Sequence, residues 1–425
     1  MHAIDQFMDG IERNRSGQGG AAVSVCSAHP DVLRATFRTA LAHDTFALIE
    51  STSNQVDQYG GYTGMQPGDF VDLVHGLAKE EGFPTERILL GGDHLGTNTW
   101  SGGPAEAALN EARVLVQAYV RAGYKKIHLD ASFVCADDRS PLSDETVARR
   151  CAAMARVCET HAKGKPPVYI IGTEVPTPGG AHDEEVLHIT TARDVETTLD
   201  VFKAVFLENG LQEAWDRVVG LVVQPGIEFS DHGVHDFQPV PELAAAILPY
   251  KGMIYEAHST DYQTAFGLRG LVDHHFYVLK VGPWLTFTLR EGLYLLEFME
   301  KELSVAAPSA FRETLLQTMR ADPVHWKKYY SGKPEEIEFK LNYSYSDRSR
   351  YYLPAAEVLA SQKRLFQNLQ ELPEPLISQF MPGQYARLRS GKLAKDTRSL
   401  LIDRISNVLE LYMAAAPSRY CKTPP

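Results

Sequence analysis

The 425-residue sequence lacks the features of several protein classes. It has five cysteines, an odd number without a Cys-x-x-Cys pair, so neither a disulfide framework nor a thiol redox motif is indicated. No apolar run approaches the ~20 residues of a membrane span, and the N-terminal segment is too acidic for a signal peptide. A net charge of −12 argues against nucleic acid and anionic membranes as partners. We therefore expect reduced thiols and a cytoplasmic location.

What the sequence does contain is an alternation of short apolar runs and helix-like stretches. The runs, rich in Val, Ile, Leu and Tyr as strands buried on both faces are, lie at 21–27, 45–51, 87–94, 125–132, 167–174, 218–225, 252–259 and 275–282. Amphipathic patterns predict helices at 31–42, 69–80, 105–123 and 144–161. Eight such units predict an α/β fold of the (β/α)₈ type, a TIM barrel.

An open, doubly wound sheet is the competing fold. It would normally carry a Gly-rich nucleotide-binding turn after an early strand, and the sequence has none. Beyond Leu303 the alternation stops and proline-punctuated helical patterns follow, at 309–321, 355–372 and 397–416. We predict a barrel over 1–303 and an α-helical extension, packed on the barrel, over 304–425.

Polar residues end all eight predicted strands. In a barrel the carboxyl ends of the strands form the mouth that holds the active site. The candidates at these ends are Ser27, Glu50, Asn54, Gln55, Asp93, His94, Asp130, Ser132, Glu174, Gln224, Glu256, His258, Ser259 and Lys280. A polar residue at the same end of every strand favours an enzyme but does not specify its reaction.

Several of these residues also have a purely structural explanation. Asp93 and His94 are either an acid beside a metal ligand or a hydrogen-bonded pair. Glu256 and His258 lie two apart on a strand and so face one side, which suits a metal site, yet His258 can equally be a hydrogen-bonded core histidine. Glu174 precedes a turn that can exist only to reverse the chain, although a carboxylate at the entry of such a turn is more often functional.

Two other residues near strand ends carry alternatives. Lys280 is either a Schiff-base lysine or a charge partner for nearby carboxylates, and the adjacent Gly282 favours the charge partner because it indicates close backbone approach to a ligand. Cys26 fits a small buried residue better than a nucleophile, since no base is fixed near it in the sequence.

Two loop segments are candidates for substrate contact. The loop at 51–69 is rich in Gly, Tyr and Asn, as expected of a loop that closes over a substrate rather than a plain surface loop. In segment 342–354, Arg348 and Arg350 lie among serines and tyrosines. They form either a phosphate clamp or a solvated basic edge.

Long motifs along nearly the whole chain resemble one family. They are CSAHP (26–30), IESTSNQVDQYGGYTGM (49–65), GGDHLG (91–96), HLDAS (128–132), IGTEVPTPGG (171–180), VVQPGIEF (222–229), YEAHSTDYQT (255–264), LKVGP (279–283), WKKYY (326–330) and YSDRSRYY (345–352). The chain closely resembles the GatZ/KbaZ family, named for the non-catalytic subunit of class II tagatose-bisphosphate aldolase. Other members resemble tagatose-6-phosphate 4-epimerases or ketose and ketouronate epimerases, and some are labelled tagatose-6-phosphate kinases.

Catalytic class II aldolases look like more distant relatives, and the comparison implies site roles. Their acid–base Asp, zinc-binding His, loop Glu and last-strand Lys match Asp93, His94, Glu174 and Lys280. Their second metal histidine falls at about Gln224, and the third at about Glu256 or His258. The departure argues against ordinary zinc aldolase activity. It leaves a divalent ion (Zn, Mg, Mn or Ni) held by His94, by Glu174 or Glu256, and by His258.

The resemblance and the residues together limit which activities are possible. A kinase is disfavoured because the sequence has no G-x-x-x-x-G-K-[ST] loop. Inverting C4 of a 2-ketose needs either a nicotinamide, for which no fingerprint is present, or retro-aldol cleavage assisted by a metal.

The first hypothesis is therefore a metal-dependent 4-epimerase that interconverts D-tagatose 6-phosphate and D-fructose 6-phosphate. Asp93 and Glu174 or Glu50, with Asp130 nearby, would move protons. Arg348 or Arg350 would bind the phosphate.

The second hypothesis is a non-catalytic, chaperone-like partner of the catalytic subunit of a class II tagatose-bisphosphate aldolase, which the altered metal positions support. The polar strand ends favour the first hypothesis, because a scaffold has little use for them.

Overall fold

The centre of the molecule is a closed barrel of eight parallel strands. A computed structural model describes residues 1–173 and 187–416. The strands are β1 (Ala22–Val25), β2 (Ala47–Thr52), β3 (Ile88–Gly96), β4 (Lys126–Asp130), β5 (Val168–Ile171), β6 (Val218–Val222), β9 (Ile254–Ala257) and β10 (Phe276–Val281). They close in the order β1-β10-β9-β6-β5-β4-β3-β2. All eight predicted strands and the (β/α)₈ barrel are confirmed.

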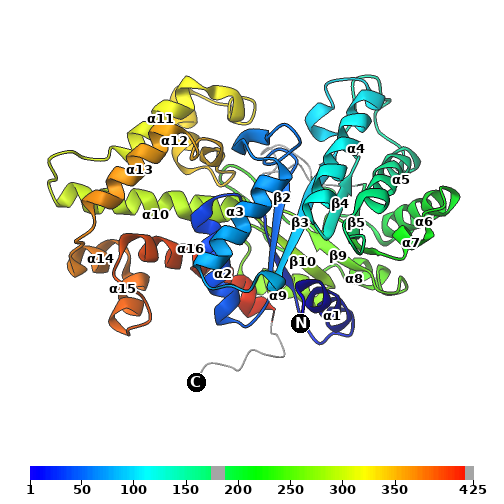
Figure 1. Cartoon of the computed structure of the whole chain (residues 1–425), viewed down its shortest axis with the longest axis horizontal. Helices are drawn as coiled ribbons and strands as arrows, with labels where there is room; N and C mark the ends of the chain where they lie inside the picture. Colours follow the sequence, from blue (N-terminus) through cyan, green and yellow to red (C-terminus); the bar gives the residue numbers. More distant parts are fainter. Residues whose placement is uncertain (174–186, 417–425) are drawn as a thin grey trace.

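Helices surround the barrel on its outer side (Figure 1). They are α2 (Pro30–Ala42), α3 (Pro67–Glu80), α4 (Ala105–Ala122), α5 (Asp144–His161), α6 (Ala192–Glu208), α7 (Gln212–Trp215), α8 (Pro241–Ala246) and α9 (Ala265–Asp273). The start and stop signals act as expected. The Ser143 hydroxyl accepts a hydrogen bond from the Thr146 amide at 3.3 Å, and Gly123 ends α4 with φ 104°. A short hairpin of β7 (Glu228–Phe229) and β8 (Val234–His235) follows β6.

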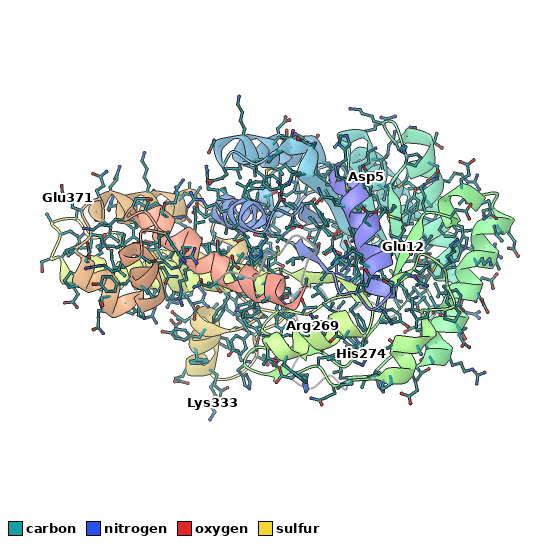
Figure 2. All side chains as sticks on the ribbon, turned by 90° about the horizontal axis from the view of Figure 1, so that it is seen from below. Asp5, Glu12, Arg269, His274, Lys333 and Glu371 are labelled. Atoms are coloured by element: carbon teal, nitrogen blue, oxygen red, sulfur yellow. The ribbon has the colours of Figure 1, made fainter. Side chains whose placement is uncertain are left out.

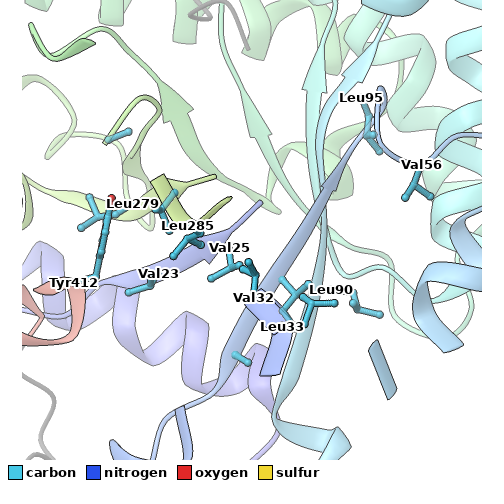
Figure 3. Close-up of a cluster of buried hydrophobic side chains, with 14 of the residues drawn as sticks. Val23, Val25, Val32, Leu33, Val56, Leu90, Leu95, Leu279, Leu285 and Tyr412 are labelled. Carbon is cyan, nitrogen blue, oxygen red and sulfur yellow. The ribbon is translucent and has the colours of Figure 1, made fainter. Parts of the chain in front are cut away.

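The hydrophobic core lies between the strands and this helical layer. Figure 3 shows part of it, with Val23 and Val25 from β1 near Val32 and Leu33 from α2. These side chains are nearly or completely buried. At roughly 25 cal/mol per Å² of apolar surface removed from water, this layer contributes much of the stabilisation of the fold.

The N-terminal end of the barrel is closed by α1 (Ala3–Arg15), which the sequence reasoning did not assign. Phe7 and Ile11 are fully buried and pack with apolar side chains from the strands. A Cβ at Gly10 would lie 2.0 Å from the Tyr277 hydroxyl, so only glycine lets the helix lie this close to β10. Figure 2 shows α1, with Asp5 and Glu12, lying across the barrel.

After the last barrel strand, α10 (Pro283–Glu302) leads away from the barrel toward a group of smaller helices (Figure 1). These are α11 (Phe311–Ala321), α12 (Pro334–Tyr343), α13 (Ala356–Asn368), α14 (Glu374–Phe380) and α15 (Pro382–Arg389). The C-terminal α16 (Thr397–Ala415) returns and packs against α2, α9 and α10. The Tyr412 hydroxyl donates to the Thr260 carbonyl at 2.8 Å, which ties this return to the barrel. The domain division at residue 303 stays a prediction.

Across the described residues, every helix is either too short or too polar to cross a lipid bilayer.

Candidate active site

A cavity of about 90 Å³ lies at the carboxyl ends of the strands. Eight of the predicted site residues line it: Asn54, Gln55, Asp93, His94, His258, Ser259, Lys280 and Arg350. The loop after β2 supplies Asn54, Gln55 and Tyr62, and the extension supplies Arg350 and Tyr351. The cavity is therefore built jointly by the barrel and by the segment that follows it.

Directly beneath this cavity, four buried side chains form a closed ring of alternating charge, which we call the charged ring. Lys126 Nζ lies 2.6 Å from both Glu50 Oε1 and Glu256 Oε2. Lys280 Nζ lies 2.8 Å from Glu50 Oε2 and 3.1 Å from Glu256 Oε1. Gly91 leaves room for it, since a Cβ there would lie 2.7 Å from the side chain of Glu50. Each ion has two opposite neighbours, which is the condition under which buried charges are tolerated.

Asp93 lies above the charged ring and faces the cavity. Its carboxylate accepts hydrogen bonds from Lys280 and, at 3.6 Å, from the thiol of Cys26. Burial alone would raise the pKa of Asp93, but His94 and Lys280 outweigh burial and hold that pKa well below its usual range. Asp93 is therefore an ionised carboxylate at the cavity floor, and Lys280 is its charge partner, as predicted, rather than a free amine.

His94 is paired with a second buried acid. Its Nδ1 lies 2.8 Å from Asp130 Oδ2, and Asp130 also accepts a 2.6 Å hydrogen bond from the hydroxyl of Ser132. Burial would lower the pKa of His94, but Asp93 and Asp130 outweigh it and raise that pKa. The same residue has φ 50°, and Ser259 on the opposite loop has φ 54°, both in the left-handed region that non-glycine residues rarely adopt. Such strain is concentrated at functional sites.

Three imidazole rings meet at the cavity floor. The ring centroids of His94 and His258 are 4.8 Å apart, and His128 lies 5.2 Å from each. Burial lowers the pKa of His258 to about 3, with Lys280 adding to the effect, so this ring is neutral. Its Nε2 lies 3.0 Å from Glu256 Oε1. The buried Nε2 of His128 has no hydrogen-bond partner among the described residues.

These residues fit a divalent cation. Asp93, His128, Glu256 and His258 can each offer one ligand atom, all within 4.8 Å of one another. Around them the buried carboxylates of Glu50, Asp93, Asp130 and Glu256 outnumber the ammonium groups of Lys126 and Lys280 by two. A divalent ion would offset that excess of negative charge, which His94 reduces when it is protonated. Of the predicted ligands His94, Glu256 and His258, the structure places the last two in this group and His94 beside it.

The remaining predicted residues lie around or below the cavity. Ser27 lines a neighbouring cavity of about 210 Å³, and the side chain of Gln224 accepts a 2.9 Å hydrogen bond from the Gly226 amide within its own turn. Arg348 is buried with its guanidinium 3.5 Å from the ring centre of Tyr329, so it is neither a solvated edge nor part of the cavity lining. Glu174 lies outside the described residues.

Sequence reasoning overlooked Lys126, His128 and Asp261. The first two alternate with Asp130 along β4, so all three face the barrel interior, and this period of two was a visible signal. Asp261 accepts hydrogen bonds from the amides of Gly282 (3.0 Å) and Trp284 (2.8 Å) at the start of α10. Burial raises the pKa of Asp261 to about 6. Asp261 lies within the motif YEAHSTDYQT (255–264), but it comes after the strand end and was given no role there.

Comparison with known proteins gives a consistent assignment. Residues 7–417 match the family described as D-tagatose-1,6-bisphosphate aldolase subunit GatZ/KbaZ-like. The chain is 46% identical over 410 residues to the D-tagatose-1,6-bisphosphate aldolase subunit GatZ of Salmonella heidelberg (strain SL476), covering 95% of this chain and 97% of that protein. The subunit of the same name from Salmonella newport (strain SL254) matches equally.

A solved structure agrees with the sequence relatives. A probable tagatose 6 phosphate kinase from Sinorhizobium meliloti 1021 superposes with a TM-score of 0.87 at 43% identity, covering 93% of this chain and all of that one. Both the family match and the relatives extend over almost the whole length of the chain. The chain therefore belongs to the GatZ/KbaZ-like family.

Proposed function

We propose that this chain is a subunit of a D-tagatose-1,6-bisphosphate aldolase, as its relatives are named. The observation that supports the proposal is the extent of the match, 46% identity over 95% of this chain and 97% of the relative. The partner would be the catalytic subunit of a class II tagatose-bisphosphate aldolase, which this chain would stabilise.

The test is to mix the purified chain with such a catalytic subunit. We expect a joint peak in gel filtration with light scattering, and a longer half-life of aldolase activity on warming than with an equal mass of albumin. An unchanged elution volume together with an unchanged half-life would contradict the proposal.

The second candidate function is catalysis by this chain itself, as a metal-dependent 4-epimerase of D-tagatose 6-phosphate and D-fructose 6-phosphate. The observation that favours it is the solvent-accessible cavity above the charged ring, with Asp93 ionised at its floor. A divalent ion held by Asp93, His128, Glu256 and His258 would supply Lewis-acid stabilisation of negative charge on a substrate oxygen.

The chain's own groups suit a phosphorylated polyol. His94, positioned by Asp130, can give or take a proton at the cavity floor. Arg350 is the arginine in the cavity lining and is the candidate for the phosphate. The Asn54 amide, in the cavity lining, is the candidate for a substrate hydroxyl, whereas the Gln55 amide is already bonded to the Thr52 amide and the Cys26 carbonyl.

The epimerase test follows the two sugar phosphates by NMR after each is incubated with the chain and Zn²⁺, Mg²⁺, Mn²⁺ or Ni²⁺. We expect conversion, with His94→Gln slower by at least ~100-fold, the usual loss of a proton-transfer group. Ser27→Ala is the matched control, because Ser27 lines the neighbouring cavity and should leave the rate near that of the unmodified chain. Absence of conversion with all four ions would overturn this function.

A further inference from the structure

The cavity has a second wall whose tyrosines the candidate chemistry does not use. It is formed by the 3₁₀ turn η5 (Arg348–Tyr351), which carries Tyr351 into the lining beside Tyr62 from the β2 loop. This turn lies in the motif YSDRSRYY, from which sequence reasoning took only the two arginines. Tyr351 thus belongs to the site by position, although it comes from the extension.

The ring of Tyr351 is fixed on several sides. It stacks on His325 with ring centres 4.6 Å apart and planes 9° from parallel. The edge of the Tyr62 ring packs against it, with ring centres 4.6 Å apart and planes at 64°. The guanidinium carbon of Arg350 lies 4.7 Å from the ring centre. A phenol held in this way has little freedom to turn its hydroxyl out of the cavity wall.

The phenolic oxygen sits next to a guanidinium that is itself anchored. Arg350 Nη2 donates to the Tyr351 oxygen at 3.2 Å. Arg350 Nη1 donates to the carbonyls of Ser346 and, at 2.8 Å, Asp347, so the guanidinium is held in place by the backbone of its own turn. A fixed cation at hydrogen-bond distance stabilises a phenolate more than a phenol.

The surrounding charges act in the same direction. Burial alone would raise the pKa of Tyr351, but Arg350 and then Arg348 outweigh burial and lower it. The neighbouring phenol behaves in the opposite way, since burial and Tyr351 raise the pKa of Tyr62. Two titratable groups whose environments separate their pKa values are the usual sign of an acid–base assignment. The titratable and charged groups that face Tyr351 are Tyr62, His325, Arg348, Arg350 and Tyr352.

We propose that Tyr351 is a catalytic proton-transfer residue of this cavity, acting on a hydroxyl of a polyhydroxy substrate while Asp93 and the histidines act at the floor. The inference rests on the second candidate function. The phenolate oxygen of Tyr351 would take the proton of the substrate hydroxyl. The resulting alkoxide would become a carbonyl as the adjacent carbon–carbon bond breaks. The electron pair of that bond passes to the substrate's ketone. Re-addition reverses each change and returns the proton, so no oxidant or reductant is needed.

The first test needs no substrate. Tyrosinate absorbance at 295 nm is recorded from pH 6 to 12 for the full chain, for Tyr351→Phe and for the control Tyr59→Phe, which removes an exposed tyrosine outside the cavity. We expect the unmodified chain to show one phenol of its 19 ionising before the others, and Tyr351→Phe alone to lose that first step. Arg350→Met should move the step to higher pH. Persistence of the first step in Tyr351→Phe would overturn the inference.

The second test separates a catalytic role from a merely structural one. In the epimerase assay we expect Tyr351→Phe to lower kcat at least 10-fold and to remove the limb of the kcat–pH profile assigned to the phenol, with KM nearly unchanged and the circular dichroism spectrum preserved. An unchanged kcat and pH profile would overturn the role. If no epimerase activity exists at all, the function fails, whereas the absorbance titration still decides whether Tyr351 ionises first.

Discussion

The two halves of the barrel interior are built from the same strands and have opposite chemistry. Toward the N-terminal end, Leu48, Ile254 and Val278 pack with α1 into an apolar cluster. Two residues further along the same strands stand Glu50, Glu256 and Lys280 of the charged ring. Both sets are buried. One half therefore stabilises the fold by excluding water, and the other holds charge in place beneath the cavity, at the end where barrel enzymes carry out chemistry.

Among substitutions in the two halves, removing one cation from the charged ring should cause the largest loss of stability. Lys126→Met removes the cation between Glu50 and Glu256 and leaves two buried carboxylates without it. We expect a loss of about 3–5 kcal/mol in the free energy of unfolding, measured with urea. Lys125→Met is the matched control on the preceding, solvent-facing residue, where the expected loss is about 1 kcal/mol or less. Equal losses for the two variants would show that the ring is not a special feature.

A substitution in the apolar half should lower the free energy of unfolding without weakening divalent-ion binding. Ile11→Ala removes a fully buried side chain from α1 and should cost about 2–5 kcal/mol in the free energy of unfolding. Met8→Ala, at a position of the same helix that is 36% exposed, should change it by no more than about 0.5 kcal/mol. Divalent-ion binding by Ile11→Ala should match that of the unmodified chain. Weakened binding would mean that the two halves are coupled.

The free energy of unfolding should depend on pH through Asp261, a buried carboxyl group of the polar half. Because burial raises the pKa of Asp261 to about 6, above its unfolded value of about 3.9, folding favours its protonated form. Its ionisation therefore destabilises the fold as the pH rises from about 4 to 6, by up to about 3 kcal/mol. Asp261→Asn should be less sensitive to pH in that window and relatively more stable at pH 7. Parallel stability curves from pH 4 to 7 would contradict the prediction.

The smallest expected change concerns a single proposed ligand. His128→Ala should weaken Zn²⁺ binding in calorimetry by at least ~10-fold, since even the outer partners of metal ligands are worth 10–100-fold. His274→Ala, at the residue directly after α9 (Figure 2), is the control, because that ring lies outside the ligand group and its Nδ1 contacts the Gly270 carbonyl at 2.7 Å. Equal affinities would remove His128 from the site.

The fold was predictable because its signals are local. Strands buried on both faces appear as short apolar runs, and each of the eight was found. The first helix was missed because its acidic residues were interpreted only as evidence against a signal peptide. Asp5, Asp9 and Glu12 lie on its exposed face, while Phe7 and Ile11 lie on the buried one.

The site was predictable only in part, for a geometric reason. Strand-end residues such as Asp93 and His258 were found because their position alone places them at the mouth. Lys126 and His128 lie inside a strand, where only the inward alternation marks them. Arg348 and Arg350 look equivalent in the sequence, yet one stacks on Tyr329 and the other lines the cavity. That difference depends on how the turn packs.

The most direct test of the central claim, that the polar half of the barrel is a working site, is anomalous X-ray scattering from a crystal soaked in Zn²⁺. We predict an anomalous peak from a Zn²⁺ ion coordinated by Asp93, His128, Glu256 and His258, directly above the charged ring. A fully soaked crystal with no peak among these four residues would contradict the claim and would leave the charged ring as a structural feature of a non-catalytic subunit.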